Sequence, residues 1–461
     1  MTETGARAAT PRADVSGLSS RVVIVGAAGR DFHDFNVVYR DDPAVEVVAF
    51  TAAQIPGIAG RRYPAALAGP RYPAGIPIEE EEQLEAICRR HGVTQVVFAY
   101  SDVRYDHVMR VGSRALAAGA DFVLLGPART MLRVRVPVVA VSAVRTGCGK
   151  SPIARWLGQR VRRAGRRVAV LRHPMPYGDL ERQRVQRFAA LADLDEAGCT
   201  VEEREEYEPH LAAGNVVFAG VDYAEIAARA SREADVIVWD GGNNDFPLLR
   251  PDLHLVVCDA LRPDDARGYY PGEAVLRAAD VIVLNKIDAA TPAMLERAVD
   301  AIRSVNPTAP MVRAASPVRL DDPAAVRGRR VLVVEDGPTI THGSMAYGAG
   351  FVAATAAGAS AIVDPRPFAP PPLAAVYARY PHIGRVVPAV GYGPLQREAL
   401  REMIDRCDAD VVVCATPVDL GRLLGASKRM VRARYEFEDP PAGGLAAHVD
   451  GWLARHPAPT A

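Results

Sequence analysis

Lysine is nearly missing from this sequence. Only three of the 55 basic residues are lysines, namely Lys150, Lys286 and Lys428, and arginine supplies the rest. A chain that avoids lysine so consistently indicates that a compact, flexible ammonium group was needed where lysine remains. An excess of charge is missing too, because 55 acidic residues balance the basic ones. This balance excludes a general electrostatic attraction to nucleic acid or to an anionic membrane.

Cysteine motifs and long apolar runs are also absent. The six cysteines form no C-x-x-C pair, which argues against zinc and a disulfide framework and favours a reducing, cytoplasmic location. No apolar run approaches the roughly 20 residues that span a bilayer, so we expect no membrane segment. Residues 1–20 are polar and lack the apolar core of a secretory signal, and we expect a disordered tail there.

Short β-branched, apolar runs alternate with amphipathic helical stretches along the rest of the chain. The clearest runs are contained in 21–26, 45–50, 93–100, 121–126, 136–144, 166–174, 234–242, 253–260, 280–288, 310–317, 329–343, 360–365 and 410–417. The alternation predicts right-handed βαβ crossovers and mainly parallel sheets. Ligands then bind at the carboxyl ends of the strands.

The runs divide into three predicted α/β units. The first is a Rossmann-like domain over 21–134, the second covers 135–328, and a C-terminal α/β domain covers 329–461. Within the first unit, the stretch 78–92 has its acids early, its bases late and a closing Gly92, which predicts a helix.

The string VRTGCGKS at 144–151 follows the first apolar run of the second unit. In a phosphate-binding loop, glycines turn backbone N–H groups toward the phosphates, a lysine reaches the β and γ oxygens, and a hydroxyl binds Mg²⁺. Val144 stands in place of the usual first glycine, and a Gly-rich turn before a helix is the alternative. The string predicts a nucleotide site formed by Gly147, Cys148, Gly149, Lys150 and Ser151.

Two more strings of the second unit follow predicted strands. VIVWD places Asp240 where a Mg²⁺-associated acid is needed. NKID supplies Asn285, Lys286 and Asp288, a pattern typical of guanine recognition, because a carboxylate matches two donors of guanine. Ser316 is a weaker candidate for base contact. Each string alone could cap a strand, but together they predict a P-loop NTPase domain with Ser151 and Asp240 at the metal.

The sequence resembles the cyclic 2,3-diphosphoglycerate synthetase family over residues 21 to about 437. The resemblance rests on the strings GAAGRDFHDFN, QIPGIAGRRYP, VRTGCGKS, WDGGNNDFP, NKID and EDGPTITHGSMAYGAG. It implies an enzyme that closes an intramolecular phosphoanhydride in 2,3-bisphosphoglycerate, driven by a nucleoside triphosphate and Mg²⁺. The archaeal synthetase uses ATP, whereas NKID indicates GTP, and both nucleotides stay open here.

Such an anionic metabolite needs basic side chains outside the phosphate loop, and bidentate arginines suit its phosphates. The candidate substrate-binding residues are Arg30, His33, Arg61, Arg62, Arg172 and His173. For Arg30 and His33, a hydrogen-bond network between domains is an equally open alternative.

Polar residues after two other strands complete the predicted catalytic set, which also includes Lys150 and Asp240. Asn243, Asn244 and Asp245 could orient the attacking group or could simply cap a turn. His342 could act as an acid–base group near neutral pH or could be structural.

A GTP-hydrolysing switch or chaperone acting on a protein partner is the competing function. NKID supports it, but dense Arg, His, Asn and Asp at the strand ends of the flanking units favour the enzyme. A homodimer would be compatible with ring closure at a domain junction.

Overall fold

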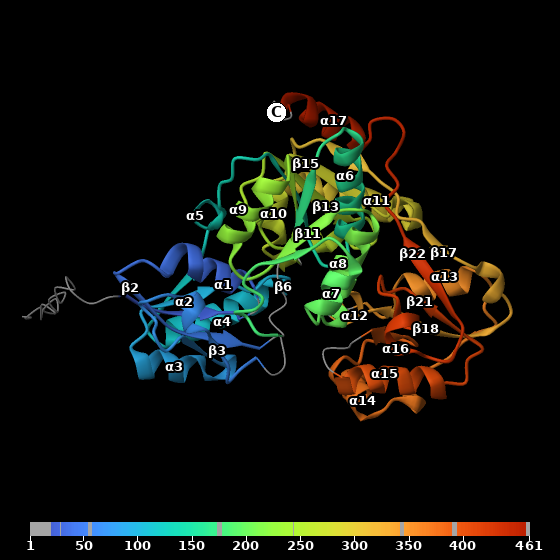
Figure 1. Cartoon of the computed structure of the whole chain (residues 1–461), viewed down its shortest axis with the longest axis horizontal. Helices are drawn as coiled ribbons and strands as arrows, with labels where there is room; N and C mark the ends of the chain where they lie inside the picture. The colour runs from blue at the N-terminus through green and yellow to red at the C-terminus, as the bar shows by residue number, and fades with distance from the viewer. Residues whose placement is uncertain are drawn as a thin grey trace, which may run out of the picture.

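The structure, a computed structural model, describes residues 20–27, 29–53, 58–172, 178–242, 244–341, 345–389 and 394–457. Its mainly parallel sheets confirm the predicted α/β class with several domains. In Figure 1 the unit built on the second sheet lies at the top, and the blue N-terminal and orange C-terminal units lie beneath it on opposite sides. The predicted tail lies outside the description except for Ser20, which begins the first strand.

The first sheet has the strand order β3-β4-β2-β1-β5-β7, and only the β3–β4 pair is antiparallel. Its strands are β1 (Ser20–Val25), β2 (Val45–Ala52), β3 (Arg62–Tyr63), β4 (Ile76–Glu80), β5 (Gln95–Phe98) and β7 (Asp121–Leu124). Its helices include α1 (Arg30–Asp34), α2 (Ala65–Ala68), α3 (Leu84–His91), α4 (Tyr105–Ala117) and α5 (Pro127–Thr130).

The helix predicted over 78–92 is wrong in its first part. Ile76 and Ile78 are buried and alternate with more exposed residues, so this segment forms strand β4 beside β2. Helix α3 begins only at Leu84 and ends at His91, and the next residue, Gly92, has a φ of 58° in the left-handed region, as the closing glycine predicted.

The second sheet has the order β10-β11-β9-β12-β8-β13-β15-β16, and only the β10–β11 pair is antiparallel. Its strands are β8 (Val138–Ala143), β9 (Val168–Leu171), β10 (Gln186–Phe188), β11 (Val216–Ala219), β12 (Val236–Asp240), β13 (Leu253–Asp259), β15 (Val281–Asn285) and β16 (Met311–Arg313). Its main helices are α6 (Lys150–Arg163), α7 (Leu191–Glu196), α8 (Val201–Ala212), α9 (Tyr223–Glu233), α10 (Gly272–Arg277) and α11 (Pro292–Val305). The central strands β8, β12 and β13 are buried along their whole length.

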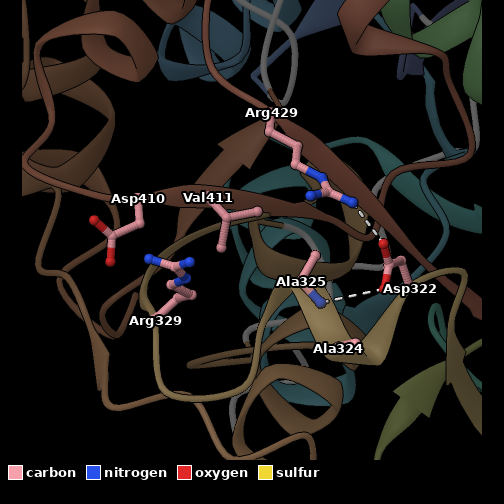
Figure 2. A pocket seen from close by; sticks show the side chains of 7 residues that line it. All are labelled: Asp322, Ala324, Ala325, Arg329, Asp410, Val411 and Arg429. Atoms are coloured by element: carbon pink, nitrogen blue, oxygen red, sulfur yellow. Dashed lines mark hydrogen bonds and ion pairs between the residues drawn. The ribbon is translucent and has the colours of Figure 1, made fainter.

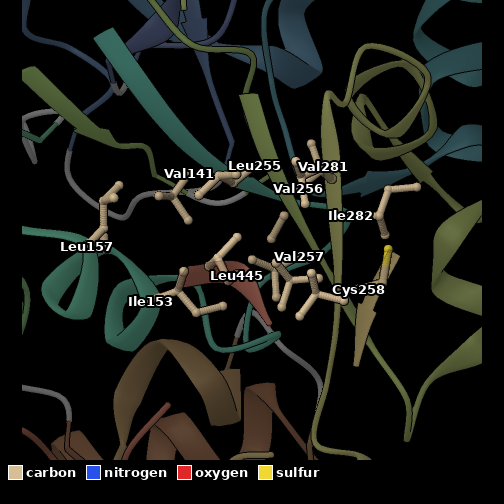
Figure 3. Close-up of a cluster of buried hydrophobic side chains, with 14 of the residues drawn as sticks. Val141, Ile153, Leu157, Leu255, Val256, Val257, Cys258, Val281, Ile282 and Leu445 are labelled. Atoms are coloured by element: carbon tan, nitrogen blue, oxygen red, sulfur yellow. The ribbon is translucent and has the colours of Figure 1, made fainter. Parts of the chain in front are cut away.

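The main core of the second unit lies between its sheet and helix α6. Val141 on β8 packs in one cluster with Ile153 and Leu157 on α6. Figure 3 shows that Leu445 joins the same cluster. Leu445 begins α17 (Leu445–Arg455), which therefore returns from the third unit to complete the core of the second.

The third sheet has the order β17-β22-β21-β18-β19, with β20 also paired to β18. Its strands are β17 (Val318–Leu320), β18 (Arg330–Asp336), β19 (Ala361–Ile362), β20 (Val387–Ala389), β21 (Val411–Cys414) and β22 (Met430–Tyr435). Its helices are α12 (Gly337–Thr341), α13 (Ala349–Ala356), α14 (Pro371–Arg379), α15 (Pro394–Arg406) and α16 (Leu420–Leu424). The predicted domain boundary at 328/329 falls between β17 and β18 of this sheet.

Specific contacts join the second unit to its two neighbours. On one side, β6 (Val103–Arg104) pairs with β14 (Tyr269–Tyr270). On the other side, Thr416 donates a 2.5 Å hydrogen bond to the buried carboxylate of Glu205 on α8. Both flanking units are therefore anchored to the second unit.

Candidate functional site

The phosphate loop leaves the carboxyl end of β8 and enters α6 at Lys150. Gly147 and Gly149 have φ values of 83° and 94°, a region that glycine adopts readily. A side chain at Gly149 would collide with the amide nitrogen of Asn285. Both glycines thus permit the backbone conformation of the loop, and Gly149 also permits its close packing against Asn285.

The backbone conformation at position 144 does not require a glycine, so valine is tolerated where the usual motif has glycine. Among the described residues, only Asp102 and Lys286 have a positive φ without being glycine, so Val144 keeps an ordinary backbone conformation. Its side chain is buried in the core of the second unit. Its carbonyl oxygen accepts a 3.0 Å hydrogen bond from Nδ2 of Asn244.

The NKID residues hold the phosphate loop from the end of β15. Nδ2 of Asn285 donates to the carbonyl oxygen of Cys148 at 2.9 Å. Nζ of Lys286 donates to the carbonyl oxygen of Gly147 at 2.6 Å and contacts Asp259 at 2.7 Å. Asn285 and Lys286 therefore shape the loop.

Asp288 and Ser316 also lie together. Oδ1 of Asp288 accepts the backbone N–H of Ser316 at 2.9 Å. The two strings that sequence reasoning assigned to one base site thus meet in space, and base recognition there stays a prediction.

Asp240 lies at the centre of a buried ionic cluster at the end of β12. Its Oδ1 is 3.3 Å from Nζ of Lys150, and its Oδ2 is 2.8 Å from Nη1 of Arg172 and 2.9 Å from Nε2 of His210. Arg172 also pairs with Glu206 on α8. Although burial opposes ionisation, the neighbouring cations Arg172 and Lys150 hold the pKa of Asp240 well below its usual range.

His210 and Glu206 are members of this cluster that sequence reasoning missed. Burial lowers the pKa of His210, so its neutral ring can donate from Nε2 to Asp240 while Nδ1 accepts from Asn215 at 3.3 Å. The sequence signal that could have revealed these two residues is the string EEREEYEPH of α8. An almost wholly polar helix with buried glutamates is uncommon, because charged side chains are seldom buried without partners.

Asp102 and Arg30 of the first unit contact the phosphate loop and the residues beside it. The backbone N–H of Asp102 donates to Oδ1 of Asn244 at 2.7 Å, and the Asp102 carboxylate pairs with Arg145 at 2.9 Å. Arg30 on α1 lies 3.8 Å from Asp245. The structure therefore brings the predicted residues Arg30, Asn244 and Asp245 together beside the loop.

The remaining predicted substrate residues have other contacts. His33 is buried, bonds to the carbonyl oxygen of Thr130 at 2.7 Å, and has its pKa lowered by burial to about 4. Arg61 donates to the carbonyl oxygen of Gly178 at 2.6 Å, and Arg62 donates to Ala74 at 2.7 Å. Arg172 is 1% exposed and points to Asp240 rather than to an open surface. Substrate binding by these four residues stays a prediction.

Three predicted residues, His173, Asn243 and His342, lie outside the described part of the chain.

The oxygen atoms of Ser151 and Asp240 beside the loop are suitable ligands for a Mg²⁺ ion bound together with nucleotide phosphates. Magnesium prefers oxygen ligands and usually retains water and phosphate in its shell. Ser151 supplies a hydroxyl in the first turn of α6, and Asp240 supplies an ionised carboxylate at the adjacent strand end. The site is therefore that of a P-loop enzyme for phosphoryl transfer.

No protein-family model matches the sequence. The chain is 55% identical over 432 residues to "Arginine synthetase ArcE" of Thermococcus kodakarensis, covering 94% of this chain and 96% of the relative. The chain belongs to the family of this arginine synthetase.

Two other similarities are partial. A tetraacyldisaccharide 4'-kinase of Anaeromyxobacter sp. (strain Fw109-5) is 33% identical over 49% of this chain and 64% of its own length. The solved structure of LpxK from Aquifex aeolicus in complex with ATP is 14% identical, with a TM-score of 0.40, over 71% of this chain and 90% of that chain.

The 55% identity to a synthetase over 94% of this chain confirms that the protein is an enzyme of the synthetase class and corrects its expected family. The cyclic 2,3-diphosphoglycerate synthetase of Pyrococcus furiosus is only 24% identical, over 41% of this chain and 48% of its own length. The predicted ring closure in 2,3-bisphosphoglycerate is therefore wrong. The competing switch or chaperone function is overturned too, because the full-length relative is a synthetase.

A separate hollow of about 550 Å³ lies in the third unit, where Arg329, Asp410 and Arg429 precede strands β18, β21 and β22 (Figure 2). It is at the amino ends of those strands.

Among the described residues, no helix is both long and apolar enough to cross a membrane.

Proposed function

We propose that this enzyme forms arginine at the expense of a nucleoside triphosphate. The observation that carries the proposal is the 55% identity to an arginine synthetase over 94% of this chain, which includes the phosphate loop and both flanking units.

The chemistry of a phosphate loop suits this product. Arginine differs from the corresponding ureido amino acid, citrulline, in one position: a ureido oxygen is replaced by nitrogen. That oxygen is a poor leaving group until it is phosphorylated. In the first step, the ureido oxygen forms a bond to the γ-phosphorus and the nucleoside diphosphate leaves. In the second step, an amine nitrogen bonds to the ureido carbon and inorganic phosphate leaves with the electron pair of the C–O bond.

Ammonia is the nitrogen donor that gives arginine directly. An amino-acid amine would give a substituted guanidine, which a separate elimination would have to cleave. We therefore include ammonia in the proposed reaction.

The loop residues provide binding and charge neutralisation for phosphoryl transfer. Lys150 would hold the β and γ oxygens, and the N–H groups of the loop would face the phosphates. Ser151 and Asp240 would hold Mg²⁺, which supplies Lewis-acid stabilisation of phosphate charge when bound. Arg172 and His210 keep the Asp240 carboxylate ionised and oriented.

The proposal is tested by incubating purified protein with citrulline, ammonium chloride, Mg²⁺ and either ATP or GTP. Arginine and nucleoside diphosphate should appear in equal amounts and depend on all components. Lys150→Ala is the inactive control. Nucleotide hydrolysis without arginine would refute the proposal.

The same assay identifies the base. If guanine contacts Asp288, Asp288→Asn will raise the KM for GTP at least tenfold while the KM for ATP changes less than twofold.

A further inference from the structure

Three charged side chains meet between the first and second units without forming close hydrogen bonds. Nη1 of Arg30 is 3.8 Å from Oδ1 of Asp245, and Nε of Arg30 is 3.8 Å from Oδ2 of Asp34. The side chains of Arg30, Asp34 and Asp245 are only 6%, 1% and 11% exposed. We call these three residues the amine cluster.

Each member of the amine cluster has a buried polar atom without a hydrogen-bond partner among the described residues. These atoms are Nη1 of Arg30, Oδ1 of Asp34 and Oδ1 of Asp245. Buried polar atoms normally form hydrogen bonds, because burying one without a hydrogen-bond partner is energetically unfavourable. Oδ1 of Asp34 therefore lacks a donor, and Nη1 of Arg30 and Oδ1 of Asp245 face each other at 3.8 Å, beyond hydrogen-bond distance, so that all three atoms can still bond to a ligand.

The charges of the cluster favour a cation that carries N–H groups. Two carboxylates face one guanidinium, so the fully ionised cluster has one excess negative charge. Asp31 lies nearby, but its Oδ1 accepts the N–H groups of Gly29 and Phe32. Burial raises the pKa of Asp34 to about 7 and also raises that of Asp245, as expected for carboxylates short of donors.

The amine cluster is close to the phosphate loop. Asn244, the neighbour of Asp245, bonds to the carbonyl oxygen of Val144 at 3.0 Å. Lys150 is near enough to Asp245 for each to affect the ionisation of the other. A group bound at the cluster is thus joined to the phosphate loop through Asn244 and lies within electrostatic range of Lys150.

We propose that Asp34 and Asp245 bind the ammonium ion that supplies nitrogen for arginine, with Arg30 fixing the two carboxylates. This inference rests on the proposed function. One carboxylate accepts a proton from ammonium, which leaves neutral ammonia with its lone pair. The nitrogen then bonds to the activated ureido carbon, the C–O bond breaks, and phosphate leaves with that electron pair.

The test measures arginine formation by Asp34→Asn and Asp245→Asn while ammonium is varied at saturating citrulline and nucleotide. We expect the KM for ammonium to rise at least tenfold, with the KM values for citrulline and nucleotide changed less than twofold. Glu205→Gln is the matched control, because it is also a buried interface carboxylate with one unbonded oxygen. Its KM for ammonium should equal that of the wild type.

Two further measurements separate this site from misfolding and from failure of the proposed function. Without ammonium, exchange of the β,γ-bridging ¹⁸O of the nucleotide in the presence of citrulline should persist in both variants, which shows that the phosphate site is intact. If wild-type protein makes no arginine, the proposed function fails. The ammonium site can be tested even then, by comparing the melting temperature in ammonium chloride with that in sodium chloride at equal ionic strength. Ammonium should stabilise the wild-type protein more than sodium does, and Asp245→Asn should remove this difference.

A rise in the KM for citrulline instead of ammonium would overturn the proposal and assign the cluster to the amino acid. Unchanged KM values in both variants would equally overturn it.

Discussion

Gly149→Ala tests whether the phosphate loop is held in a conformation that only glycine permits. An alanine at φ 94° costs about 1–2 kcal/mol in backbone strain. The new Cβ would also displace the amide of Asn285, which is 1% exposed and bonded to Cys148 at 2.9 Å. Losing that buried bond costs about another 1–3 kcal/mol. We expect the variant to lose about 2–5 kcal/mol of unfolding free energy.

The same displacement distorts the loop that faces the phosphates and should weaken nucleotide binding at least tenfold, which corresponds to a loss of about 1.4 kcal/mol of binding free energy. Calorimetric titration with a nonhydrolysable nucleotide measures this loss. Gly165→Ala is the matched control: Gly165 follows the other end of α6 with φ 76°, and nothing lies within 4 Å of an added Cβ. The control should lose stability but bind nucleotide normally. Equal nucleotide affinity in the two variants would refute the reasoning.

Three other perturbations follow from the same structure. Arg172→Met removes a partner of fully buried Asp240 and should lower the unfolding free energy by about 3–5 kcal/mol in urea, whereas Arg167→Met, at an exposed ion pair, should change it much less. Lys286→Met removes the 2.6 Å bond to the loop and should raise the KM for the nucleotide at least tenfold while the KM for citrulline changes less than twofold; an unchanged nucleotide KM would contradict this role. The pKa of Asp34 is raised from 3.8 to about 7, so the folded state binds the extra proton and its stability falls as pH rises between these values. Asp34→Asn should therefore stabilise the protein by up to about 4 kcal/mol at pH 8 and have little effect at pH 4, measured by denaturation at both values.

Much of the fold could be predicted because buried parallel strands are apolar on both faces. The runs at β1, β8, β12, β13, β15 and β18 are of this kind. Short strands such as β4 and β17 were missed, since they are only partly buried and carry charged residues. Their pairing is decided by neighbours distant in the sequence.

Some residues of the candidate site could be predicted from the sequence and others could not. Lys150, Asp240 and Asn285 could be placed because the phosphate loop and strand ends have local patterns. His210 could not, because its partner Asp240 is on another element and nothing in the local string specifies the contact. The identity of the second substrate was also missed, since the recognised strings concentrate at the phosphate loop and strand ends that phosphoryl-transfer enzymes need in common.

The return of α17 to the second unit affects how the protein can be made. Val449 and Trp452 of this helix fill the same core as Ile153 and Leu157 of α6, the helix that begins at the phosphate loop. On the ribosome, the nucleotide-binding unit would emerge with this part of its core open and would stay so while the third unit is synthesised. An apolar surface would be exposed for that interval, and the third unit would have its own core available before the second is complete. The order of maturation would thus differ from the order of the units along the chain.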